Sequence, residues 1–229
     1  MILKHFLLYS EADDGIAEVE NSFTFQSRCI TALYERCFSK FQNGNIKQIN
    51  IFCVKDSPNP TLTIVDGFCD VEIHYDVSEF FKLEDKEKKE LVLVILKQGI
   101  DKVVKVNNWE SKPFDDAYNC VKVEKHKNEY VWKKPKSSPN RNYKAEVFIN
   151  HGLYLCEIYL VVKDKNGNEI VKKLVSTTKP DELIFSRYLG ELNWLSNYEV
   201  ALFNRPKSNY VSVNIKEVLF NYRVRLFNN

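Results

Sequence analysis

The chain has 229 residues, of which 44% are hydrophobic, 13% aromatic and 28% charged. This composition excludes a disordered chain and predicts a globular protein with a well-formed core. The net charge of +2 is too small for the chain as a whole to attract nucleic acid or an anionic membrane by long-range electrostatics. No stretch approaches the roughly 20 apolar residues of a membrane-spanning helix, so we expect no membrane contact.

The first half of the sequence alternates strand patterns with helix patterns. The opening strand pattern favours a buried strand over a signal peptide, and the longest helix pattern carries a wide apolar stripe that we expect to cover the sheet. Asp66-Gly67 is typical of a tight turn. The predicted strands span 2–10, 46–54, 61–65 and 68–76, and the predicted helices span 22–41, 84–107 and a shorter segment after Ser111.

The second half carries almost only strand patterns. Its clearest feature runs from Leu153 to Val175, where two extended arms meet at Asn166-Gly167. This dipeptide favours a hairpin turn because both residues tolerate positive φ. In the first arm, Cys156, Ile158 and Leu160 alternate with Glu157 and Tyr159, so the first three are predicted to face the core. Further strands are predicted at 143–150, 183–185, 198–203, 210–215 and 218–227.

These patterns predict an α+β fold. N-terminal strands with two or three helices packed on a sheet occupy residues 1–132, and a mainly antiparallel β-meander or small sandwich occupies residues 143–229. Residues 133–142, which are rich in lysine, serine and proline, are interpreted as a linker. The two regions form either two packed domains or one compact domain.

The six cysteines lie within apolar patterns, and none forms a Cys-x-x-Cys pair. With no export signal, we interpret them as reduced core residues of a cytoplasmic protein. The seven glycines are isolated, so no phosphate-binding loop is predicted, and we expect no cofactor. The cysteines are Cys29, Cys37, Cys53, Cys69, Cys120 and Cys156.

Two segments carry residues that favour specific chemistry. Asp70, Glu72 and His74 lie two apart on one strand, so they share a face and are candidate metal ligands of a hydrolase or nuclease. The competing interpretation is the wet face of an amphipathic strand. Residues 125–143 mix lysines with aromatic rings, which suits phosphates and stacked bases, although a solvated linker explains the same pattern.

The remaining candidates are residue types that anchor contacts with proteins. They include two tryptophans, an acidic pair that opens a predicted helix, and two residues on the outward side of the hairpin's first arm. These candidate partner-binding residues are Trp109, Trp132, Asp115, Asp116, Glu157 and Tyr159.

As a whole, the chain resembles the immunity proteins of bacterial polymorphic toxin systems. The resemblance is carried by the short start Met1-Ile-Leu-Lys, by alternating strands and charged helices, and by the stretch Phe114-Asp115-Asp116-Ala117-Tyr118 before a strand-rich half. It implies a non-catalytic cytoplasmic protein that binds a cognate toxin domain and blocks it by complementary shape and charge. The near-neutral charge departs from the strongly acidic inhibitors expected for basic nuclease toxins, which argues against a nuclease as the partner.

Overall fold

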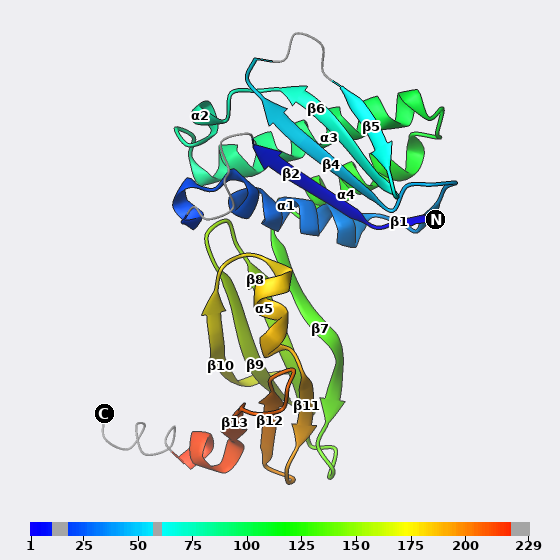
Figure 1. Cartoon of the computed structure of the whole chain (residues 1–229). Helices are drawn as coiled ribbons and strands as arrows, with labels where there is room; N and C mark the ends of the chain where they lie inside the picture. Colours follow the sequence, from blue (N-terminus) through cyan, green and yellow to red (C-terminus); the bar gives the residue numbers. More distant parts are fainter. Residues whose placement is uncertain (11–17, 57–60, 221–229) are drawn as a thin grey trace. The chain divides into compact units, whose positions relative to one another are not determined.

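The computed structural model describes residues 1–10, 18–56 and 61–220. The chain divides into two compact units, whose elements are labelled in Figure 1. Unit 1 contains Met1–Asn128 together with Gly152–Tyr154, and unit 2 contains the remainder. Unit 1 combines a mixed sheet with helices and unit 2 is built mainly from antiparallel strands, so the predicted α+β class is confirmed.

Unit 1 is organised around a four-stranded sheet with the strand order β2-β4-β6-β5. The first three strands are parallel, and β5 returns antiparallel to β6 through the turn at Asp66-Gly67, where both residues have positive φ. A two-stranded ribbon, β1 with β3, completes the strands. The strands are β1 (Ile2–Leu3), β2 (His5–Ser10), β3 (Phe41–Gln42), β4 (Gln48–Val54), β5 (Leu62–Val65) and β6 (Phe68–His74).

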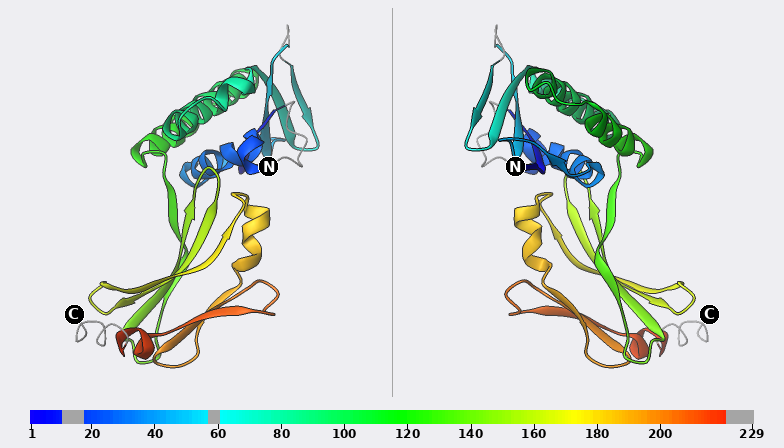
Figure 2. Two further views of the ribbon diagram at one scale, coloured as in Figure 1. Left: turned by 90° about the vertical axis from the view of Figure 1, so that its left-hand side faces the viewer. Right: turned by 90° about the vertical axis from the view of Figure 1, so that its right-hand side faces the viewer.

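Helices cover one face of this sheet, as Figure 2 shows for α1, α3 and α4. The apolar residues of β4 and β6 that point to this face, such as Ile49, Ile51 and Val71, are fully buried against helical residues. The helices are α1 (Phe23–Cys37), α2 (Val77–Phe80), α3 (Asp85–Val106) and α4 (Lys112–Val123), with a short 3₁₀ turn at Val19–Asn21.

Helix α1 begins at a Ser22 cap, whose hydroxyl accepts a hydrogen bond from the Phe25 amide at 3.2 Å. It ends at Cys37, before the predicted end at residue 41, because Phe38 adopts an extended backbone and packs its ring 5.1 Å from Phe114. The hydroxyl of Tyr34, a fully buried residue, donates to the Phe114 carbonyl at 3.0 Å. These contacts join α1 to α4.

A buried ion pair fixes α1 against the sheet. Arg28 donates two hydrogen bonds to the Glu35 carboxylate, at 2.9 and 3.1 Å, and both side chains are largely buried. The same carboxylate accepts from the Phe6 amide of β2 and lies 3.7 Å from Nδ1 of His5. Burial disfavours the Glu35 carboxylate, but the hydrogen bonds from His5 and Arg28 outweigh this effect and lower its pKa.

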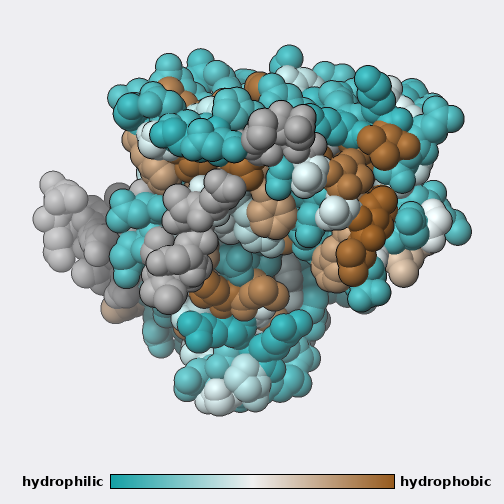
Figure 3. Space-filling view, turned by 45° about the horizontal axis from the view of Figure 1, so that its top comes forward, coloured by the Kyte–Doolittle hydropathy of each residue, from teal (hydrophilic) through white to brown (hydrophobic). Residues whose placement is uncertain are grey.

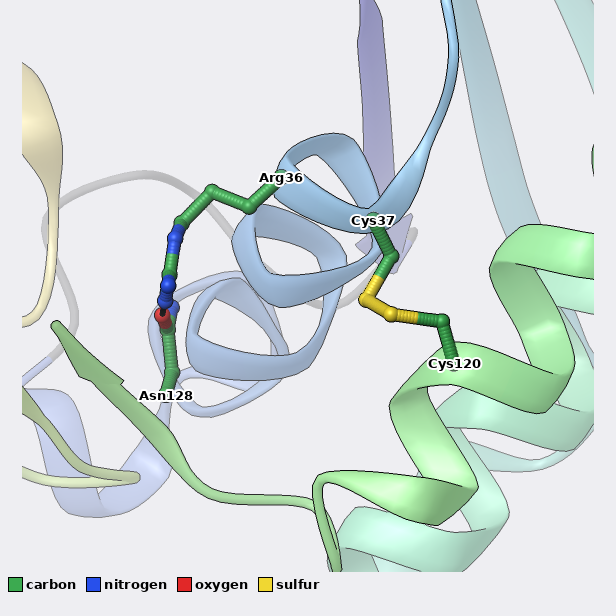
Figure 4. Close-up of a disulfide and its surroundings, with 4 residues drawn as sticks. All are labelled: Arg36, Cys37, Cys120 and Asn128. Atoms are coloured by element: carbon green, nitrogen blue, oxygen red, sulfur yellow. Dashed lines mark hydrogen bonds between the residues drawn. A yellow bond between two sulfur atoms is a disulfide. The ribbon is translucent and has the colours of Figure 1, made fainter.

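Two cysteines that we expected to be reduced are bonded to each other. Cys37, at the end of α1, forms a disulfide with Cys120 of α4 across 83 residues of sequence (Figure 4). The expectation failed because the sequence pattern does not show that these two helices pack side by side, which places the two Cα atoms 5.9 Å apart. The other four cysteines are free and buried, as expected.

Unit 2 contains two sheets around a second core. A four-stranded sheet has the order β10-β9-β8-β7, and a three-stranded antiparallel sheet has the order β11-β12-β13. Cys156, Ile158 and Leu160 of β9 are fully buried, which confirms the predicted inward side of the first hairpin arm. The strands are β7 (Asn128–Ser137), β8 (Tyr143–His151), β9 (Cys156–Asp164), β10 (Glu169–Thr178), β11 (Glu191–Trp194), β12 (Glu199–Phe203) and β13 (Tyr210–Asn214).

Several local predictions for the second half are wrong. Residues 133–137 of the expected linker belong to β7, and the remainder form the turn into β8. Residues 183–185 are helical in α5 (Glu182–Phe185), because the Asp181 carboxylate accepts from the amides of Leu183 and Ile184. A 3₁₀ turn follows at Ser186–Tyr188. Residues 215–220 are helical where a strand was predicted from 218, and the rest of that prediction lies outside the described residues.

The hairpin turn also differs in detail from its prediction. Gly167 has a φ of 90°, whereas Asn166 does not adopt positive φ, so the turn is longer than the expected two-residue type. Its loop is closed by backbone hydrogen bonds from Gly167 to Asp164 and from Asp164 to Asn168, and the Asp164 carboxylate accepts from the Asn166 and Asn168 amides. The position that requires left-handed backbone is therefore the glycine alone.

Candidate protein-binding surface

Most of the surface visible in Figure 3 is hydrophilic, and hydrophobic side chains gather there in smaller patches. Residue type alone therefore does not locate a binding surface, and strand register is the better guide. In the β8-β9-β10 sheet of unit 2, one face packs into the core. The other face carries half-buried and exposed side chains, apart from Val161, which is buried. We call the second face the outer sheet face. It includes Lys144, Glu146, Phe148, Asn150, Glu157, Tyr159, Val161, Lys163, Lys172 and Leu174.

Two aromatic rings and a lysine form the centre of the outer sheet face. Phe148 of β8 lies directly opposite Tyr159 of β9, with their ring centroids 6.3 Å apart. The ammonium of Lys172, on β10, lies 4.5 Å from the Phe148 centroid and 4.4 Å from the Tyr159 centroid. Exposed contacts between a cation and a ring contribute about 0.5–1 kcal/mol each, so Lys172 favours this arrangement of the two rings. Beside them, Leu174 pairs with Tyr159 across β9 and β10 and is 48% exposed.

A carboxylate organises the polar side of the same face. Glu157 accepts hydrogen bonds from the Asn150 side-chain amide and from the Tyr159 hydroxyl, each at 2.9 Å. Desolvation and the adjacent Glu157 raise the pKa of Tyr159, so the phenol stays a neutral donor. Lys163 and Glu146 form a further ion pair on this face. The arrangement provides a rigid aromatic centre with a polar surround, which is the usual anatomy of a protein interface.

Two of the six candidate partner-binding residues, Glu157 and Tyr159, therefore lie together on the outer sheet face. Sequence reasoning missed Phe148 and Lys172, because their proximity depends on strand register. The alternation along β8 and β9 does place Phe148 and Tyr159 on the outward side of their strands. The pairing of β9 with β10 could not be deduced in the same way, because it is interrupted by two irregularities.

Neither of the two tryptophans belongs to the outer sheet face. Trp109 packs against the core of unit 1, with its ring centroid 5.1 Å from Phe41 and 6.0 Å from Phe114. Trp132 packs against the core of unit 2, and the Lys133 ammonium lies 3.9 Å from its ring centroid. Both rings are therefore part of the packing of their own unit.

The acidic pair at the start of α4 also has local partners. Asp115 lies 2.9 Å from the Lys97 ammonium of α3, and this hydrogen bond, followed by one from Ser111, lowers the pKa of Asp115. Asp116 lies 2.6 Å from Lys112, one helical turn earlier. Exposed pairs of this kind contribute little to stability and fit the favourable position of acidic residues at a helix start.

The candidate metal ligands share the solvent side of β6, as predicted, but the two carboxylates have other partners. Asp70 accepts from the Asn50 amide at 2.7 Å, and Glu72 accepts from the Thr61 amide at 2.9 Å. Within residues 1–10, 18–56 and 61–220, no three His, Cys, Asp or Glu side chains are placed to hold a metal ion. The arrangement is that of an amphipathic strand.

The basic segment 125–143 falls in different structural settings. Lys125 and Lys127 belong to unit 1, in the turn after α4, whereas Lys133, Lys136 and Arg141 belong to unit 2. The aromatic residues Tyr130, Trp132 and Tyr143 pack against the core of unit 2, so these rings are not free platforms for nucleobases.

Comparisons with known proteins return no match to any family model, curated protein or solved structure. In the part of the chain that the structure describes, no helix combines the length and the apolar composition needed to cross a bilayer. Function therefore has to be inferred from the surfaces of this chain itself.

Proposed function

We propose that this protein is a non-catalytic inhibitor that binds a partner protein, and that it acts as an immunity protein against a cognate toxin domain. The observation that carries the proposal is the centre of the outer sheet face, where Phe148, Tyr159 and Lys172 are held together in contact with solvent. Tyrosine and other aromatic residues in fixed positions supply most of the binding energy at interfaces.

The polar groups around this centre support binding rather than catalysis. The Glu157 carboxylate is engaged by Asn150 and Tyr159, and Glu146 is engaged by Lys163, so these acids are arranged as hydrogen-bonding partners. A sheet face also offers a preformed backbone, and cross-strand contacts among its side chains reduce the freedom that is lost on binding.

The proposal is tested by co-expression of the protein with the product of each adjacent open reading frame, followed by growth assays and co-purification. We expect one toxic product to be neutralised and to co-purify. Substitution of Tyr159 by alanine should weaken binding about 30-fold or more, since truncating a central interface residue costs roughly 2 kcal/mol. Failure of every neighbouring product to be neutralised or to co-purify would count decisively against the proposal.

A matched control separates the binding role from general effects of removing a tyrosine. Tyr210 lies on the other sheet of unit 2 and is 57% exposed. A Tyr210→Ala variant should keep the affinity of the unaltered protein. Equal losses in the Tyr159→Ala and Tyr210→Ala variants would show that the outer sheet face is not the binding surface.

A further inference from the structure

A strongly basic pocket lies in unit 1, between the first turns of α3 and the end of α4. It has a volume of 570 Å³, within the range of small-molecule sites. Two lysines come from α3, one from α4, and two from the turn that follows α4. Five lysines, one histidine and one aspartate line this lysine pocket: Lys86, Lys89, Lys122, Lys125, Lys127, His126 and Asp85.

The positive charge of the lysine pocket is poorly compensated. Lys86 lies 3.8 Å from Glu90, and the Lys122 ammonium lies 5.5 Å from the Tyr118 ring centroid. Among the described residues, Lys89, Lys125 and Lys127 form no ion pair. Asp85, the single acid of the lining, accepts a hydrogen bond from the Tyr154 hydroxyl at 2.8 Å.

The histidine of the lining has a lowered pKa, and the main cause is partial burial. Glu90 opposes this shift in the pKa of His126, while the charges of Lys89 and Lys122 add to it. The backbone beside the pocket adopts an unfavourable conformation, because Lys125 and His126 both have positive φ, at 52° and 58°. Two consecutive non-glycine residues in this conformation are unfavourable, and they bring three basic side chains to one side of the pocket.

We infer that the lysine pocket binds a small, multiply phosphorylated ligand. This inference goes beyond the proposed inhibition of a toxin and does not depend on it. Lysine ammonium groups bind phosphate as point charges, and each phosphate group brings up to about two negative charges. A ligand with several linked phosphates therefore concentrates enough charge to engage lysines from all three segments within one pocket of 570 Å³.

The lining disfavours two other polyanions. An acidic peptide carries one charge per side chain, and in an extended chain the side chains on one face are about 7 Å apart, so few of its carboxylates fit. Single-stranded nucleic acid binds through aromatic rings that stack on bases, and the lining contains no Phe, Tyr or Trp. Neither limit applies to a compact oligophosphate, because its charges are closely spaced and it has no bases to stack.

The test is calorimetric titration of the full chain with inorganic triphosphate at low ionic strength. We expect one triphosphate per chain and an affinity that falls as salt is added. The double substitution of Lys89 and Lys125 by alanine should weaken binding about tenfold, because each exposed charge pair changes affinity roughly two- to fivefold. The control replaces two exposed lysines of unit 2, Lys144 and Lys165, and should leave the affinity unchanged.

Thermal unfolding of each variant verifies that the fold is retained. Absence of binding heat with the unaltered chain, or equal loss in the control variant, would overturn the inference, since the second result would indicate diffuse charge only. Hexaglutamate or a single-stranded oligonucleotide that binds as tightly as triphosphate would likewise refute selectivity for a compact phosphate ligand. Tighter binding of triphosphate than of either competitor, lost in the pocket variant alone, would establish the site.

Discussion

Reduction of the Cys37–Cys120 disulfide should strongly destabilise unit 1. The bond closes 83 residues of sequence, and a loop of that length restricts the unfolded chain enough to contribute about 4.5 kcal/mol at 25 °C. For a unit of this size, such a loss lowers Tm by about 15 °C. The perturbation is either a reductant or the Cys120→Ser substitution.

The assay is thermal unfolding followed by circular dichroism, with and without reductant. Thiol titration of denatured protein verifies the state of the bond, because Cys29, Cys53, Cys69 and Cys156 are free in either state. Reductant should have no further effect on the Cys120→Ser variant, which serves as the control. An unchanged Tm after verified cleavage of the bond would refute the loop-closure reasoning.

Two further predictions concern unit 1. The pKa of Glu35 is below its ordinary 4.5 and that of His5, raised mainly by its hydrogen bond to Glu35, is above its ordinary 6.5. Glu35 stabilises the fold above pH 4.5 and loses this effect as pH falls through its folded pKa, whereas His5 stabilises it below pH 6.5 and loses this effect as pH rises through its folded pKa. Urea unfolding should therefore show the greatest stability between pH 4.5 and pH 6.5. The Glu35→Gln substitution should lower the free energy of unfolding by about 3 kcal/mol and flatten its dependence on pH. An unaltered pH profile in this variant would refute the assignment. A Cβ at Gly99 would lie 2.5 Å from Cδ1 of Ile51, so Gly99→Ala should lower the free energy of unfolding in urea by about 1–3 kcal/mol. The control is Gly44→Ala, which should be near neutral because an added Cβ would meet no atom within 4 Å. Equal losses in the two variants would contradict the packing argument.

The sequence was most informative where one periodicity dominated. The alternation along β9 correctly separated Cys156, Ile158 and Leu160 from Glu157 and Tyr159, because a strand with one buried face must keep its register. It failed at 183–185, where an apolar triplet matched a strand but the Asp181 cap starts a helix turn. A short apolar run does not distinguish these structures, and the capping side chain decides between them.

Features that depend on three-dimensional pairing were beyond the sequence. The spacing of Cys37 and Cys120 does not indicate that α1 and α4 are neighbours, and four other cysteines offered equally plausible positions. The outer sheet face was predicted only in part for the same reason. The alternation along a strand identifies its outward residues, such as Glu157 and Tyr159. The contact between Lys172 and Tyr159 depends on the register of β10 on β9, which the alternation does not give.

The assignment of Gly152–Tyr154 to unit 1 has a practical consequence for any attempt to dissect this protein. Leu153 is 3% exposed within the core of unit 1, and Tyr154 accepts a hydrogen bond from the buried Lys88 at 3.0 Å. A fragment that ends at Asn128 therefore lacks a core side chain and leaves a buried ammonium short of a partner. The first unit is specified by two separate stretches of the chain, and expression of residues 1–128 alone should give a poorly folded product.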